Sequence, residues 1–103
     1  MFSIARDFSP NPGPRYIRQG ANSGELLRRK LLRIVRAAGG KIRIDLDGTK
    51  GMGSSFLDEA FGGLVRNEGV DRERLLKQLD LRSSVDPSYV DEIRDSIQRA
   101  HRD

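Results

Sequence analysis

A strand, a glycine-rich loop and a helix follow one another within residues 41–65, and this unit constrains the fold more than any other part of the chain. Apolar and charged residues alternate over residues 41–47, which predicts a strand with one buried and one wet face. Three glycines interrupt the pattern between residues 48 and 53. Apolar residues then recur every three or four positions over residues 55–65, which predicts a helix with one buried stripe.

Two serines at the junction of loop and helix have two interpretations. Ser54 and Ser55 lie where helix N–H groups and the helix dipole favour negative charge, including that of a phosphate. Ser55 with Asp58 also resembles a capping box, and the residues alone favour helix capping. Gly62 and Gly63 each cost about 1 kcal/mol relative to alanine in mid-helix. We therefore expect close backbone packing there, against the sheet or a partner.

The flanking segments predict the element order β-β-α-β-α-α-β-α. The expected strands are residues 2–5, 15–19, 41–47 and 79–83, and the expected helices begin near residues 22, 55, 71 and 87. The first two strands are expected to form an antiparallel hairpin around a proline-rich loop, and Gly39 and Gly40 to end the first helix through a left-handed residue. The sequence thus predicts one α/β domain over residues 1–103, with a small, mixed, mainly parallel sheet of about four strands and helices mostly on one face.

Composition narrows the chemistry. The chain has no cysteine and one histidine, His101, so thiol chemistry is excluded and a metal site or a histidine-based triad is not expected. Gly48 and Gly53 have P-loop spacing, but Ser54 and Ser55 stand where that motif requires lysine and then serine or threonine, which argues against nucleotide hydrolysis. A non-enzymatic, cytoplasmic protein without cofactor or membrane span is expected, because no long apolar segment occurs.

Charged side chains supply two further hypotheses. The carboxylates at residues 45, 47, 58 and 59 are expected to serve solvation and the helix dipole rather than acid–base catalysis. The first predicted helix has a basic face made of Arg29, Lys30, Arg33 and Arg36. Such a face can bind phosphates, so a nucleic-acid-binding accessory protein is the alternative function, although a solvated face is commoner. A weaker alternative is an enzyme acting on a phosphorylated ligand held at Lys50.

The run Met52-Gly53-Ser54-Ser55-Phe56-Leu57 resembles the Met-Asp-Ser-Ser-Gly-Leu pattern of STAS domains, the bacterial anti-sigma-factor antagonists. The segments IDLDGTKGMGSSFLDEAFGGLV and PGPRYIRQGANSGELLRRKLL are more similar still to a STAS-like domain family of unknown function. The resemblance covers roughly residues 8 to 70. It implies a STAS-like fold and a regulatory protein-interaction module that acts in signalling.

The resemblance also implies a partner and a switch. In the antagonists, a GHKL-type ATPase that is both serine kinase and anti-sigma factor phosphorylates a serine of the motif and is thereby released. Ser55 matches the phosphoacceptor position, and Ser54 is its neighbour. The residues expected to dock the partner are Lys50, Met52, Gly53, Phe56, Asp58 and Glu59. Gly53 replaces the aspartate of the pattern, and Phe56 replaces its glycine, which is expected to add bulk to the docking face.

Overall fold

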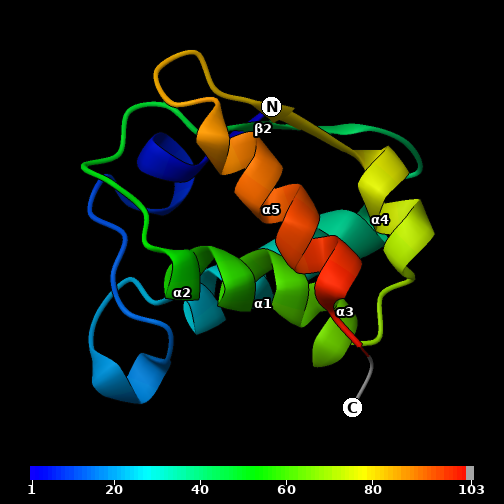
Figure 1. Ribbon diagram of the computed structural model, residues 1–103, viewed down its shortest axis with the longest axis horizontal. Helices are drawn as coiled ribbons and strands as arrows, with labels where there is room; N and C mark the ends of the chain where they lie inside the picture. The colour runs from blue at the N-terminus through cyan, green and yellow to red at the C-terminus, as the bar shows by residue number, and fades with distance from the viewer. Residues whose placement is uncertain (102–103) are drawn as a thin grey trace.

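The computed structural model describes residues 1–101 and contains a sheet of three parallel strands, with β2 in the centre. The strands are β1 (Phe2–Ser3), β2 (Ile42–Asp45) and β3 (Leu79–Arg82). Ile44 pairs with Phe2 of β1 on one side and with Leu81 of β3 on the other. Figure 1 shows the helices gathered below the sheet. The predicted α/β class and parallel sheet are therefore confirmed, with one strand fewer than expected.

The two faces of the sheet differ as the alternating sequence predicts. Ile42 and Ile44 are buried toward the helices, whereas Arg43 between them is exposed. On the outer face, Arg82 Nε lies 2.9 Å and Arg43 Nε 3.3 Å from the Asp80 carboxylate. Hydrogen bonds from Arg82 and then from Arg43 hold the pKa of Asp80 below its ordinary value. Arg43, Asp80 and Arg82 therefore pair with one another on the outer surface.

Four helical segments cover the inner face of the sheet. They are α1 (Gly24–Ala37), a continuous helix over residues 54–66, α4 (Arg72–Gln78) and α5 (Ser88–Arg99). The helix over residues 54–66, called the serine helix below, consists of α2 (Ser54–Leu57), a wider π-type turn η3 (Asp58–Gly62) and α3 (Gly63–Arg66). No helix within residues 1–101 has the length and apolarity needed to cross a bilayer.

The serine helix is the centre of the core, and it packs between α1 and α5. Its apolar residues Leu57, Phe61 and Leu64 have no exposed surface. A Cβ at Gly63 would lie 2.8 Å from Arg28 Cδ of α1, and one at Gly62 would lie 3.2 Å from the Ser96 carbonyl oxygen of α5. Close packing is therefore present at these glycines, but the predicted neighbours, the sheet or a partner, are wrong, because the contacts come from α1 and α5. This packing fixes the direction in which the helix presents its first turn.

The predicted strand over residues 15–19 is wrong, and so is the antiparallel hairpin. Residues Ile17–Gln19 form a 3-10 turn, η2. The Tyr16 N–H donates to the Gln19 side chain at 3.0 Å, and the Ile17 N–H donates to the Glu25 carboxylate at 2.9 Å. These side chains take the backbone donors that strand pairing would need. β1 pairs instead with β2, and the chain leaves it through the π-type turn η1 (Ile4–Phe8).

The helix boundaries follow the predicted signals in part. Ser23 caps α1, since its hydroxyl accepts the Leu26 N–H at 3.1 Å. The prediction that Gly39 and Gly40 provide a left-handed end is wrong. The helix ends at Ala37, the following Ala38 is extended with φ −83°, and neither glycine has a positive φ.

Candidate functional site

The two serines lie on the surface, in the first turn of the serine helix at the carboxyl edge of the sheet. Ser54 and Ser55 are both exposed, and the residue in the N-cap position is Gly53. No side chain caps the helix there, so the capping-box interpretation of Ser55 and Asp58 is wrong. Asp58 turns to Arg15 instead, with Oδ2 2.9 Å from Nη1. Neither serine is therefore committed to the helix cap that the sequence favours.

The glycine loop that precedes the serine helix is attached to two other segments. The Lys50 N–H donates to the Pro10 carbonyl at 2.9 Å, which joins the loop to the proline-rich segment. The Met52 N–H donates to Tyr89 Oη of α5 at 3.2 Å. The Lys50 side chain is exposed, whereas Met52 is buried. The backbone entering the helix is thus fixed from both sides.

Asp47 joins this loop to the segment between β3 and α5. Its carboxylate accepts the Ser84 N–H at 3.0 Å, the Ser84 hydroxyl at 2.6 Å, the Val85 N–H at 3.0 Å and the Ser83 hydroxyl at 3.2 Å. Hydrogen bonds from Ser84, then Val85 and Ser83, lower the Asp47 pKa to about 2. The expectation of simple solvation is wrong for Asp47, because its carboxylate organises a loop. At neutral pH it is ionised and cannot serve as a general acid.

A buried ion-pair cluster lies beneath the start of the serine helix. The Glu59 side chain is 4% exposed and pairs with Arg28 of α1. Arg15 Nη1 approaches the other Glu59 oxygen at 3.2 Å, and Arg28 Nε lies 3.0 Å from Glu68. Burial alone would lower the Arg15 pKa, but hydrogen bonds with Asp58 and Glu59 outweigh it and raise that pKa. The expectation that Glu59 is solvated is therefore wrong, since its charge is buried and paired.

The residues predicted to dock a partner separate into two layers. Phe56 is 1% exposed and its ring packs 6.2 Å from that of Phe8, so the expected bulk at the docking face is absent. The exposed layer consists of Lys50, Gly53, Ser54 and Ser55, with Asp58 half-buried, and the buried layer consists of Met52, Phe56 and Glu59. The buried layer holds the surface in place rather than contributing to it.

The structure adds neighbours that the sequence did not single out. Val85 is 81% exposed at the tip of the segment that Asp47 holds. Tyr89 anchors the glycine loop, and Arg15 anchors the first turns of the serine helix through Asp58. The proximity of Val85 and Tyr89 to the loop had no local signal in the sequence, because it depends on the parallel alignment of β2 and β3. The sequence around Val85, Ser-Ser-Val-Asp-Pro, is typical of a turn and therefore gives only a weak indication that the valine is exposed.

The basic face of α1 lies apart from the serines. Arg29, Lys30, Arg33 and Arg36 are all exposed. Arg29 Nη2 lies 3.4 Å from Glu25 one turn earlier, and Lys30 Nζ donates to the Asp7 carbonyl. Arg33 and Arg36 form no ion pair within residues 1–101. The predicted cationic face is therefore present as a surface, while the adjacent Arg28 turns inward to Glu59.

Metal chemistry gains no support from the geometry of the described residues. Within residues 1–101, no group of three or more histidine, cysteine, aspartate or glutamate side chains is arranged to hold a metal ion. The carboxylates near the serines are engaged by arginines or by loop N–H groups. The first turn of the serine helix offers an exposed hydroxyl pair, and the loop before it carries an exposed lysine.

Comparison with known families gives one match. Residues 23–89 match the family described as STAS-like domain of unknown function (DUF4325), which covers α1, β2, the serine helix, α4 and β3. No curated protein and no solved structure matches the chain.

Proposed function

The chain belongs to the family of STAS-like domains of unknown function, and we propose that it is a non-enzymatic regulatory module that binds a protein partner through the start of the serine helix. The docking face would consist of Lys50, Gly53, Ser54, Ser55 and the exposed edge of Asp58. By its resemblance to the anti-sigma-factor antagonists, the partner would be a GHKL-type ATPase with serine kinase activity.

The observation that carries this proposal is the exposure of Ser55 on a turn whose supports are buried and paired. Its hydroxyl is available at a helix start, and the helix below it is fixed by Glu59, Arg28 and Arg15. Phosphorylation would add about −1.5 to −2 charge at pH 7. That charge would lie one turn from Asp58, where it would repel an acidic partner surface and alter docking without unfolding the helix start.

The two departures from the antagonist pattern are compatible with docking. A Cβ added at Gly53 would meet no atom within 4 Å, so the missing aspartate leaves open space and not a collapsed turn. Phe56 fills the core rather than the surface. Gly53→Asp restores the aspartate of the antagonist pattern and should fold normally. Its phosphorylation can therefore be compared with that of the wild type.

The test is binding and phosphorylation with the GHKL-type ATPase of the same host. We expect the wild type to bind and to accept phosphate on Ser55, as mapped by mass spectrometry. Ser55→Asp should weaken binding, Ser55→Ala should bind and resist release by ATP, and Ser54→Ala is the matched control with an equally exposed neighbour. Equal affinities of wild type, Ser55→Ala and Ser55→Asp would exclude a phosphorylation switch at Ser55. If no variant binds, a GHKL-type ATPase is excluded as the partner.

The second candidate function is nucleic-acid binding through α1. It is favoured by the exposure of Arg33 and Arg36, which have no carboxylate partner within residues 1–101. Binding of this kind should weaken steeply with salt, with a slope of about 0.9 per neutralised phosphate on double-stranded DNA. Arg33→Gln with Arg36→Gln should lower both affinity and slope, whereas Lys50→Gln should change neither. A gel shift that is absent at low salt would exclude this function.

A further inference from the structure

The exposed side of α1 carries a groove in which apolar and cationic side chains lie together. It consists of two adjoining hollows, of about 530 Å³ and 460 Å³, and Arg29 lines both. The larger hollow is lined by Phe8, Asn22, Leu26, Arg29, Lys30 and Arg33. The smaller is lined by Tyr16, Ile17, Arg18, Glu25 and Arg29. The two hollows together are called the α1 groove below.

The α1 groove holds exposed apolar surface that the core does not use. Leu26 is 43% exposed and Ile17 is 40% exposed, whereas Leu27 and Leu31 of the same helix are buried. Phe8 adds a half-buried ring, which lies 6.2 Å from the Phe56 ring. Exposed apolar side chains that share a groove with polar residues mark interaction sites, unlike apolar residues scattered singly over a surface.

The lining of the α1 groove is strongly cationic. Four cations stand against one carboxylate, Glu25, which gives an excess of three positive charges. Glu25 is already engaged, because one oxygen accepts the Ile17 N–H at 2.9 Å and the other lies 3.4 Å from Arg29. Arg33 belongs to none of the ion pairs within residues 1–101. This charge complements an acidic occupant.

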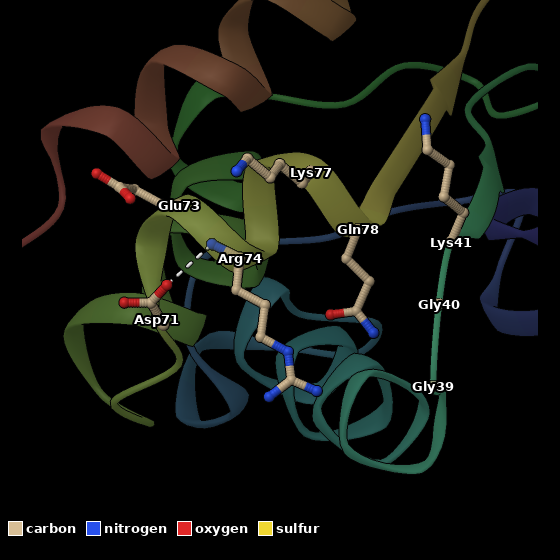
Figure 2. A pocket seen from close by; sticks show the side chains of 8 residues that line it. All are labelled: Gly39, Gly40, Lys41, Asp71, Glu73, Arg74, Lys77 and Gln78. Atoms are coloured by element: carbon tan, nitrogen blue, oxygen red, sulfur yellow. Dashed lines mark hydrogen bonds between the residues drawn. The ribbon is translucent and has the colours of Figure 1, made fainter.

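The hollow at the amino edge of the sheet lacks this combination. It measures about 420 Å³ and is lined by the carboxylates of Asp71 and Glu73 as well as by cations. Figure 2 shows Lys41 and Lys77 directed away from it. None of the exposed large apolar side chains of residues 1–101 lines it. The concentration of positive charge around apolar surface therefore distinguishes the α1 groove from that hollow.

The spacing of the groove residues on α1 suits a short amphipathic segment. The residues Leu26, Arg29, Lys30 and Arg33 are at positions i, i+3, i+4 and i+7, so they share one face of the helix. That face spans roughly two turns, or 10 Å. A peptide of similar length can place apolar side chains against Leu26 and Phe8 and carboxylates against the arginines.

The apolar part of the α1 groove favours a peptide over a nucleic acid. Its exposed apolar side chains, Leu26 and Ile17, are aliphatic, whereas single-stranded nucleic acids stack their bases on aromatic rings. The Arg18 guanidinium carbon lies 4.9 Å from the centre of the Tyr16 ring, and Phe8 packs against Phe56. A phosphate backbone would contact the cations alone, whereas an acidic amphipathic peptide contacts both kinds of side chain.

We propose that the α1 groove binds an acidic amphipathic segment of a partner protein. Leucine-like side chains of the segment pack against Leu26 and Ile17, and its carboxylates pair with Arg29 and Arg33. This interface is separate from the proposed docking face, because neither Ser54 nor Ser55 lines either hollow. It competes with nucleic-acid binding for Arg33, so the test must separate these two occupants.

The test is fluorescence anisotropy of labelled probes titrated with the full chain. The acidic probe is the peptide Asp-Asp-Leu-Glu-Glu-Leu-Leu-Asp-Asp, and the comparison peptide has serine in place of each leucine. We expect saturable binding of the acidic probe and about tenfold weaker binding of the comparison peptide, a difference of 1.4 kcal/mol, because only the acidic probe covers the apolar surface. Equal binding of the two peptides, or no saturable binding, would overturn the proposal.

Duplex DNA is the third probe, and it tests the other class of partner. We expect the acidic peptide to bind more tightly than duplex DNA at about 0.15 M salt, where contacts between exposed charges are largely screened. DNA that binds more tightly than the peptide and displaces it would assign the α1 groove to nucleic acid and overturn the proposal.

Variants of the apolar surface test the contact with Leu26. Leu26→Ser should weaken binding of the acidic peptide about tenfold and leave the fold unchanged, because this side chain is already exposed. Val85→Ser is the matched control, since Val85 is 81% exposed but lines neither hollow. Equal effects of the two substitutions would overturn the proposal.

Variants of the charged residues separate the groove from net charge. Arg29→Gln with Arg33→Gln should weaken peptide binding at least as much as Leu26→Ser. Lys41→Gln with Lys77→Gln removes the same charge outside the groove and should have little effect. Ser55→Asp should bind the peptide as the wild type does, so a failure of this proposal is distinguishable from a failure of the docking function. Equal losses from the two double variants would overturn the proposal.

Discussion

At the carboxyl ends of the strands Asp47 accepts hydrogen bonds from Ser84 and Val85, whereas at the amino ends the buried Gln78 oxygen has no partner within residues 1–101. Both groups belong to the segments that flank β2 and β3, so the same sheet places them at opposite edges. The satisfied edge presents a fixed surface, which suits a protein partner. The amino edge instead leaves a buried acceptor unpaired beneath an open hollow of about 420 Å³.

The largest expected effect comes from breaking the buried support of the carboxyl edge. Glu59→Gln removes the charge that pairs with Arg28 and Arg15, and it leaves buried arginine charge poorly compensated. We expect a loss of about 3 kcal/mol in the free energy of unfolding, measured by urea denaturation. Asp58→Asn is the control, because that side chain is 27% exposed and should cost less than about 1 kcal/mol. Equal losses would mean that burial of the pair is unimportant.

The next effect concerns the contact that joins α1 to the serine helix. A Cβ at Gly24 would lie 2.5 Å from the Phe56 carbonyl oxygen, so Gly24→Ala must move one helix relative to the other. We expect a loss of about 1–3 kcal/mol in thermal or urea unfolding. Gly40→Ala, at the open amino edge, should be tolerated because nothing lies within 4 Å. A neutral Gly24→Ala would show that this contact is looser than the structure indicates.

A smaller effect is expected from pH at the carboxyl edge. The Asp47 pKa is about 2 in the folded chain and 3.8 ordinarily, so its stabilising contribution is complete above about pH 4 and is lost as the pH falls toward 2. The protection of the Ser84 and Val85 amides against hydrogen exchange, relative to the intrinsic exchange rate at each pH, should therefore fall over that range. Asp47→Asn should show fast exchange at every pH, with the acid-dependent part removed. An identical pH profile in the variant would assign the acid sensitivity to another group.

The smallest effect is expected at the serine itself. Because no side chain caps the serine helix, Ser55→Ala should change the free energy of unfolding by less than about 0.5 kcal/mol. Urea denaturation of wild type and variant measures this directly. A loss near 1 kcal/mol, the usual value for an N-cap, would restore the capping role and weaken the case for a free hydroxyl.

Local patterns predicted the central elements well. The alternation around Ile42 and Ile44 gave β2 its buried face, and the helical spacing after Ser55 gave the serine helix, because both patterns reflect burial on one side of a regular element. The close packing at Gly62 and Gly63 was predicted from the cost of glycine in a helix. The predicted strand at residues 15–19 failed because its apolar alternation is short, and because the side chains of Gln19 and Glu25 accept the backbone N–H groups that strand pairing would use.

The sequence by itself determined the α/β class, the strand-loop-helix unit and the position of Ser54 and Ser55 at a helix start, since these follow from periodicity and glycine placement. Only the tertiary structure decided that Glu59 is buried while Ser55 is free, because that depends on Arg28 and Arg15 arriving from distant segments. It also decided how the buried Gln78 amide is oriented, because the carbonyls that accept its N–H groups belong to Val35 of α1 and to Ala38 directly after it. Charge and polarity are local properties, but burial and pairing depend on contacts between segments far apart in the chain.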